Sequence, residues 1–128
     1  MIFVDTNVFM YAVGGTHPLR EEARAFFRDT LTRRETLVTS VEVLQELMHA
    51  YLPVDRTETL HAAMALARAR MAAVWPVDVS DIDLALALCD AEEGLEARDL
   101  IHLACARRRD ARAIKTFDRG LAAAFARL

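Results

Sequence analysis

Four short runs of strand-like residues, separated by longer stretches of helical periodicity, constrain the fold of this chain more than any other feature. The runs lie at residues 2–4, 36–39, 74–77 and 113–116; the first is fully apolar, and the short length and apolar or β-branched residues of the runs predict β-strands. Helices are expected between and after them, at residues 8–13, 18–34, 40–52, 55–71, 80–93, 99–109 and 118–127. This alternation predicts an α/β fold in which helices cover both faces of a parallel sheet through right-handed crossovers.

The size and composition of the chain predict one domain that spans residues 1–128. An apolar fraction of 54% argues against disorder, and the chain has no internal repeat or linker-like stretch. The N-terminal apolar run has no basic leader and is interrupted by Asp5, so neither a signal peptide nor a membrane helix is expected, and the predicted location is the cytoplasm. Cys89 and Cys105 lie in helical apolar stretches and are expected to be buried thiols.

Polar residues at two helix starts have the spacing of a capping box, in which two side chains bind each other's backbone amides. The pairs are Thr39 with Glu42 and Ser80 with Asp83. Both pairs are expected to fix where their helices begin.

Four acidic residues, far apart in sequence, lie in or beside runs that are expected to be buried. They are Asp5, Glu46, Asp99 and Asp118. Sites in parallel sheets form beyond the carboxyl ends of the strands, and Asp5 and Asp118 closely follow strands, so the four are expected to converge at one edge. Buried carboxylates repel one another unless a cation lies among them, and oxygen ligands alone indicate Mg²⁺ or Mn²⁺.

Each acidic residue also has a structural alternative. Asp5, Asp99 and Asp118 could interact with helix N-termini, and Glu46 could lie on a solvated helix face. At the first helix, either of the two polar residues after Asp5 is expected to provide the cap and leave its carboxylate free. The four residues together, rather than any one, favour a site.

Two neighbouring residues have open roles. Glu42 lies one turn before Glu46 and either only caps its helix or adds to the acidic site. His102 lies one turn after Asp99 and could be a base or a substrate contact, but a place in the core or behind the ligands is favoured. The histidines lack the mutual spacing of a zinc site.

The basic residues are nearly all arginines, although the formal net charge of −3 does not indicate nucleic-acid binding. Of 16 basic residues only Lys115 is a lysine, and arginine suits bidentate contacts to phosphate. Arg107, Arg108 and Arg119 are therefore candidates for contacts to an RNA backbone. Solvated helix faces alone would also explain them.

Four segments, in the right order and spacing along the chain, resemble the PIN domain family. They are Val4-Asp5-Thr6-Asn7-Val8, Leu44-Gln45-Glu46-Leu47, Asp99-Leu100-Ile101-His102-Leu103-Ala104 and Ile114-Lys115-Thr116-Phe117-Asp118-Arg119. In length and layout the chain is similar to the VapC-type ribonuclease toxins of bacterial toxin–antitoxin pairs. The family often has a further acidic residue two positions after the last aspartate, where this chain has Gly120.

The resemblance implies a three-layer α/β/α domain that hydrolyses RNA phosphodiesters, forms a homodimer and is neutralised by a small cognate antitoxin. Its acidic site would be Asp5, Glu46, Asp99 and Asp118. The three aspartates would hold Mg²⁺ or Mn²⁺, and Glu46 would orient or deprotonate a metal-activated water. Supporting polar residues would hold these ligands or waters; they are Thr6, Asn7 and Thr116.

Other functions stay open at this point. One is a phosphohydrolase with an aspartyl nucleophile after its first strand, but such enzymes usually have a second aspartate where this chain has Asn7. The others are a housekeeping PIN nuclease and a non-catalytic module that binds RNA or protein and has a vestigial acidic pocket. Metal-dependent RNA cleavage would separate the catalytic from the non-catalytic alternatives.

Overall fold

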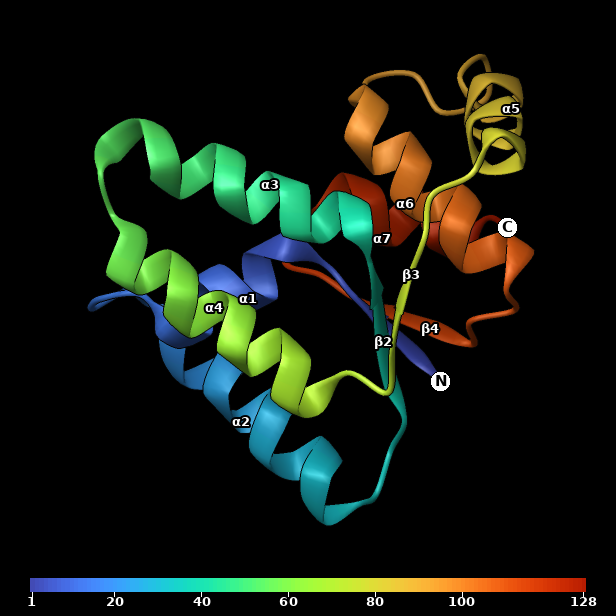
Figure 1. The fold of residues 1–128 in the computed structure, drawn as a ribbon. Helices are drawn as coiled ribbons and strands as arrows, with labels where there is room; N and C mark the ends of the chain where they lie inside the picture. Colours follow the sequence, from blue (N-terminus) through green and yellow to red (C-terminus); the bar gives the residue numbers. More distant parts are fainter.

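A computed structural model describes residues 1–128 of the chain. Its centre is a sheet of four parallel strands in the order β3-β2-β1-β4 (Figure 1). The strands are β1 (Ile2–Val4), β2 (Leu37–Ser40), β3 (Ala73–Trp75) and β4 (Ala113–Lys115). The predicted short-stranded parallel sheet is therefore confirmed.

Helices cover both faces of this sheet, as expected. They are α1 (Thr6–Val13), α2 (Arg20–Thr32), α3 (Val41–Tyr51), α4 (Thr57–Arg70), α5 (Val79–Leu88), α6 (Ala97–Arg108) and α7 (Arg119–Ala126), with a 3₁₀ turn, η1 (Leu52–Val54), before α4. In Figure 1, α1 to α4 lie on one side of the sheet and α5 to α7 on the other, which gives three α/β/α layers. None of these helices combines the length and the apolar character that crossing a membrane requires.

The strand β1 lies between β2 and β4 and is covered on both faces. Phe3 in β1 is fully buried and belongs to the same core cluster as Phe9 of α1 and Leu47 of α3. Leu103 of α6 and Leu121 of α7 form a second buried cluster. Burial on both faces explains why the first strand reads as a continuous apolar run rather than an alternating one.

The strand register brings two sequence-distant polar residues together at the carboxyl edge of the sheet. Val4 pairs with Lys115 in the parallel ladder between β1 and β4. Asp5 and Thr116, the next residues in each chain segment, therefore lie side by side. The chain turns in opposite directions from β1 to reach β2 and β4, and such a switch point is where open α/β sheets place their sites.

The expected capping box of Thr39 and Glu42 is not formed. Thr39 belongs to β2, and its hydroxyl donates to the carbonyl oxygen of Val4 at 2.8 Å. Ser40 is the N-cap residue of α3 and makes no side-chain cap bond. The threonine thus ties β2 to the last residue of β1 rather than starting a helix.

The capping box of α5 lies two residues before the expected pair. The side chain of Asp78 accepts a hydrogen bond from the backbone nitrogen of Asp81 at 3.1 Å. The side chain of Asp81 accepts one from the backbone nitrogen of Asp78 at 2.9 Å. The fully buried carboxylate of Asp81 also accepts hydrogen bonds from Arg108 and Arg109. These contacts hold the start of α5 against the end of α6.

The two cysteines differ in burial. Cys105 on α6 is buried, as predicted, whereas Cys89 at the end of α5 is exposed, so the prediction of burial is wrong there. The helix α5 packs mainly against α6 and leaves its other side uncovered, with Leu86 among its exposed apolar residues.

Candidate active site

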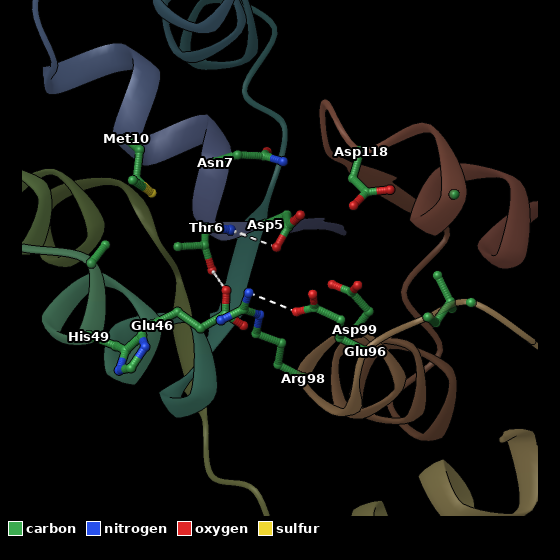
Figure 2. A pocket seen from close by; sticks show the side chains of 14 residues that line it. Asp5, Thr6, Asn7, Met10, Glu46, His49, Glu96, Arg98, Asp99 and Asp118 are labelled. Carbon is green, nitrogen blue, oxygen red and sulfur yellow. Dashed lines mark hydrogen bonds and ion pairs between the residues drawn. The ribbon is translucent and has the colours of Figure 1, made fainter.

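The four acidic side chains that the sequence singles out line one cavity of about 580 Å³ at the carboxyl edge of the sheet (Figure 2). Asp5 follows β1, Glu46 lies on α3, Asp99 is in the first turn of α6, and Asp118 precedes α7. Four separate elements thus contribute one carboxylate each. Thr6 and Asn7 also line this cavity, whereas Thr116 lies behind Asp5 and contacts it.

Asp5 is held rigidly at the bottom of the site. One carboxylate oxygen, Oδ1, accepts from the backbone nitrogen of Thr6 at 2.7 Å, and Oδ2 accepts from the hydroxyl of Thr116 at 2.7 Å. Asp5 is therefore itself the N-cap residue of α1, contrary to the expectation that a later residue would provide the cap. Burial raises the pKa of Asp5 above its ordinary value, and His102 and the two hydrogen bonds offset this only in part.

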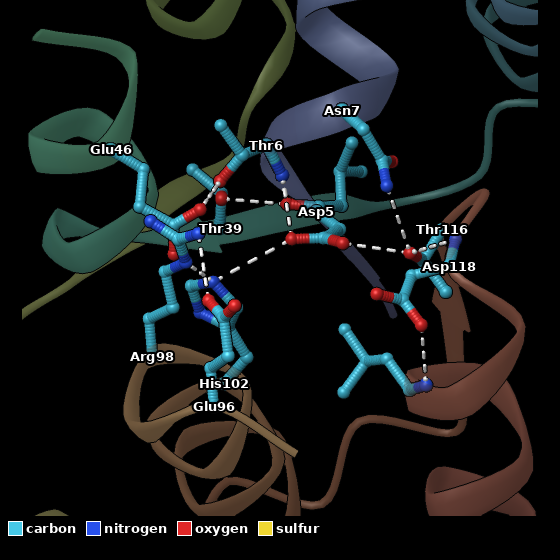
Figure 3. Close-up of polar contacts among 12 residues, drawn as sticks. Asp5, Thr6, Asn7, Thr39, Glu46, Glu96, Arg98, His102, Thr116 and Asp118 are labelled. Atoms are coloured by element: carbon cyan, nitrogen blue, oxygen red, sulfur yellow. Dashed lines mark hydrogen bonds and ion pairs between the residues drawn. The ribbon is translucent and has the colours of Figure 1, made fainter. Parts of the chain in front are cut away.

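Thr116 is the centre of a small hydrogen-bond network that fixes the turn after β4 (Figure 3). Its hydroxyl oxygen accepts from the side-chain nitrogen of Asn7 at 3.4 Å and from the backbone nitrogen of Asp118 at 3.0 Å. The side-chain oxygen of Asn7 accepts from the backbone nitrogen of Phe117 at 3.2 Å. This hydrogen-bond network links the start of α1 to the segment that carries Asp118.

Glu46 is anchored from two sides. Its Oε2 accepts from the hydroxyl of Thr6 at 2.8 Å, and its Oε1 lies 2.6 Å from Nε2 of His102. Burial alone would raise the pKa of Glu46, but the hydrogen bond and charge of His102, together with the bond from Thr6, outweigh it and lower the pKa below its ordinary value. Glu46 is therefore a carboxylate at neutral pH, in the core-facing part of the site.

Asp99 and Asp118 lie nearer the mouth of the cavity, where both point toward the space in front of Asp5 (Figure 2). Burial, and then the charges of Asp5 and Asp118, raise the pKa of Asp99 to about 6. Asp118 is exposed, and its Oδ1 accepts from the backbone nitrogen of Leu121 at 3.0 Å as the cap of α7. The cluster thus carries more negative charge than its own residues neutralise.

The donor set of this cavity fits a hard divalent cation. The three aspartates offer only oxygen, the ligand type that Mg²⁺ and Mn²⁺ prefer. The mutual repulsion that raises the pKa of Asp99 is the unfavourable term that a cation would relieve. Deeper in the site, one ligand atom from each of Asp5, Glu46 and His102 lies within 4.8 Å of the others.

The three arginines that the sequence offers as RNA-backbone candidates lie at different distances from the cavity. Arg107 and Arg108 lie at the end of α6 opposite Asp99, about 13 Å along the helix axis at about 1.5 Å per residue. Arg108 also donates to Asp81 at 2.7 Å, because a buried carboxylate requires a partner. The guanidinium of Arg108 is therefore directed away from the cavity. Arg119 is exposed beside Asp118, in the first turn of α7.

Sequence reasoning missed Arg98, which is the only arginine in the lining of the cavity. Its guanidinium reaches across the mouth toward Glu46 and is held by Glu96 at 2.7 Å (Figure 2). The available signal was its place directly before Asp99. Glu42 lines a neighbouring shallow pocket instead, and burial and then the charge of Glu46 raise the pKa of Glu42.

Comparisons with known proteins place this geometry in a family. The sequence model of the PIN domain matches residues 2–126. The chain is 54% identical over 125 residues to Ribonuclease VapC23 of Mycobacterium tuberculosis, and the match covers 98% of both chains.

Two solved structures share the fold. VapC20 of Mycobacterium tuberculosis, described as a sarcin–ricin loop cleaving toxin, has a TM-score of 0.80 and 21% identity over 97% of this chain and 95% of its own. FitAcB from Neisseria gonorrhoeae has a TM-score of 0.72 and 20% identity over 98% and 94%, respectively. The chain therefore belongs to the PIN domain family.

Proposed function

We propose that the chain, acting as one domain, is a VapC-type endoribonuclease toxin that hydrolyses RNA phosphodiesters with the help of Mg²⁺ or Mn²⁺. The observation that carries this proposal is the single cavity into which four separate elements direct Asp5, Glu46, Asp99 and Asp118. The close similarity to a protein named as a ribonuclease supports it. A purely structural role would not require four carboxylates to share one cavity at the cost of their mutual repulsion.

Asp5, Asp99 and Asp118 would hold the cation. Asp5 is the most rigid of the three because both of its oxygens already accept hydrogen bonds, and each oxygen keeps a further lone pair. Asp99 and Asp118 face the same space from the opposite wall of the cavity. When bound, the cation supplies Lewis-acid polarisation of the phosphodiester and lowers the pKa of a water molecule.

Glu46 would orient or deprotonate the attacking water. Its pKa lies below the ordinary value, so the side chain is ionised at neutral pH and can accept a hydrogen bond from that water. The hydrogen bonds from Thr6 and His102 fix its carboxylate but leave lone pairs directed elsewhere.

Arginines at the mouth would hold the RNA backbone. Arg98 lines the cavity and is half exposed, and Arg119 is exposed next to Asp118, so both can reach a phosphate outside the carboxylate cluster. Arginine donates in a planar fork that matches phosphate oxygens. We expect these two residues, rather than Arg107 and Arg108, to provide backbone contacts.

The partners we propose are a small cognate antitoxin, which would cover this cavity, and a second copy of the chain in a homodimer. The toxin would act in the cytoplasm, where RNA is its substrate. Co-expression with the protein encoded by an adjacent short reading frame should abolish growth arrest caused by the toxin. Growth arrest that no adjacent gene product relieves would favour a housekeeping nuclease.

Cleavage of a structured RNA by the purified chain tests the proposal. Mg²⁺ or Mn²⁺ should support cleavage, EDTA should stop it, and Asp5→Asn should abolish it while leaving the circular dichroism spectrum unchanged. The variant Asp83→Asn, on the exposed side of α5, is the matched control and should cleave normally. Cleavage that survives both EDTA and Asp5→Asn would contradict the assignment.

A further inference from the structure

The imidazole of His102 is the group that joins the two deepest carboxylates of the site. His102 is fully buried on α6, one turn beyond Asp99, and its ring packs against Phe3 of β1 with centroids 5.6 Å apart. Its Nε2 lies 2.6 Å from Oε1 of Glu46 and 3.5 Å from Oδ1 of Asp5 (Figure 3). No other side chain is within hydrogen-bonding or ion-pairing reach of both carboxylates.

The two carboxylates around Nε2 determine whether this nitrogen donates or accepts a hydrogen bond. The oxygens of ionised carboxylates only accept, so a nitrogen between two such groups must carry a hydrogen and donate it. The short contact shows that the hydrogen bond goes to Glu46, and the longer one places the same N–H beside Asp5. This donor role holds whether the ring carries one proton or two.

The other ring nitrogen argues against a role in packing alone. Nδ1 of His102 is buried and has no hydrogen-bond partner. An unpaired buried polar atom destabilises the folded state, so an apolar side chain of similar volume would suit this position better if filling space were the only requirement. The bare Nδ1 also differs from the usual metal-bound histidine, whose second nitrogen is held by a carbonyl or carboxylate.

Glu46 depends on His102 because its side chain is long and enters the site from α3, on the other side of the sheet. Thr6 holds only one of its oxygens, at 2.8 Å. The second anchor, from α6, prevents rotation about the carboxylate and keeps the like-charged oxygens of Glu46 and Asp5 separated by a donor.

We propose that His102 is a positioning residue that holds Glu46 and Asp5 in place for metal binding and for catalysis, without itself touching the metal or the RNA. The proposal rests on the proposed nuclease function for its kinetic consequence, and on the geometry alone for its effect on metal affinity. Residues that support metal ligands in this way typically change affinity or activity by about 10- to 100-fold when replaced.

Two variants separate the donor from the ring. Leucine at position 102 fills the space without a donor, whereas glutamine can place an amide N–H near the position of Nε2. We expect His102→Leu to weaken Mn²⁺ binding, measured by titration calorimetry, by about 10- to 100-fold and to lower kcat more than it changes KM for RNA. His102→Gln should recover most of both losses.

A buried neighbour on the same helix provides the control. Leu103→Ala removes a core side chain without reaching a carboxylate, so it should lower the melting temperature yet leave Mn²⁺ affinity unchanged in the folded protein. Normal Mn²⁺ affinity in the leucine variant would overturn the proposal, as would equal losses in the leucine and glutamine variants. If the leucine variant does not fold, His102→Asn replaces it, because asparagine is too short to place its donor at Nε2. Should wild-type protein bind Mn²⁺ but cleave no RNA, the nuclease function fails while the Mn²⁺ affinities still decide the role of His102.

Discussion

Replacing Asp99 by asparagine should stabilise the metal-free protein at neutral pH while removing its ability to be stabilised by metal. Asp99 shares a cavity with three other carboxylates and is half-buried on the first turn of α6. Burial, and then the charges of Asp5 and Asp118, raise the pKa of Asp99 from 3.8 to about 6. Asparagine has the same size and carries no charge, so the repulsion should disappear in the variant.

The size of the effect follows from this pKa. At about 1.4 kcal/mol per pKa unit, ionising Asp99 costs about 3 kcal/mol in the folded state. Solvent screens a half-buried group, so we take about half of this, or about 1–2 kcal/mol. Because the folded pKa is raised, the cost is absent below about pH 4, grows as the pH rises, and is fully present above about pH 6. For a chain of this length the gain corresponds to a melting temperature higher by about 4–8 °C.

Thermal denaturation in EDTA measures the effect. At about pH 7.5 the Asp99→Asn variant should melt several degrees above wild type, and at about pH 4 the two should melt together. Added Mn²⁺ should raise the melting temperature of wild type but not of the variant. Asp90→Asn, at an exposed position after α5, should change stability by less than about 0.5 kcal/mol. A metal-free variant that melts below wild type at about pH 7.5 would show instead that the Asp99 carboxylate has a stabilising partner and is not destabilised by its neighbours.

Three further substitutions test other parts of the structure. Asp81→Ala leaves the guanidinium groups of Arg108 and Arg109 without their buried partner, so it should cost about 3–5 kcal/mol in urea denaturation, and without altering Mn²⁺ affinity in the folded protein. These arginines outweigh the effect of burial and hold the pKa of Asp81 well below its ordinary value, so the loss should shrink as the pH falls below about 4; a loss that persists unchanged in acid would contradict this. Thr116→Val removes the donor to Oδ2 of Asp5 and should lower RNA cleavage by about 10- to 100-fold in kinetic assays; unchanged cleavage would show that the hydroxyl does not hold the ligand. Arg98→Gln should weaken RNA binding and reduce the salt dependence of log Kd by about one phosphate contact, while an unaltered salt slope would exclude it from the backbone interface.

The sequence predicts the sheet and the edge at which the site lies because both follow from local patterns. Fully apolar runs such as Ile2–Val4 specify buried parallel strands, and the residue directly after such a strand must lie at its carboxyl edge. Asp5 could therefore be placed at the carboxyl edge of the sheet without knowledge of any side-chain contact, whereas its position beside β4 depends on the strand order, which the structure provides. The alternation of elements was sufficient for this level of detail.

Contacts that depend on how helices rotate and compete for partners could not be predicted in this way. The helix α6 turns His102 inward onto Glu46 because its apolar neighbours pack against the sheet and α7, an outcome of the whole core rather than of the local spacing. The sequence around Arg108 is typical of a solvated helix face or of an RNA-binding surface. In the structure, Arg108 instead donates a hydrogen bond to the buried Asp81 of α5. The spacing of Thr39 and Glu42 is that of a capping box. Because Thr39 lies in β2, however, its hydroxyl donates to the carbonyl oxygen of Val4 in the neighbouring strand.

Diffraction from crystals soaked in Mn²⁺, recorded at a wavelength where manganese scatters anomalously, shows whether the cavity holds a cation. We expect an anomalous peak in the cavity, within coordination distance of carboxylate oxygens of Asp5 and Asp99, at about 2.1–2.3 Å. The Asp5→Asn variant should lose that peak under the same soak. Manganese bound only elsewhere on the protein, with these carboxylates facing solvent, would show that the acidic cavity is not a metal site.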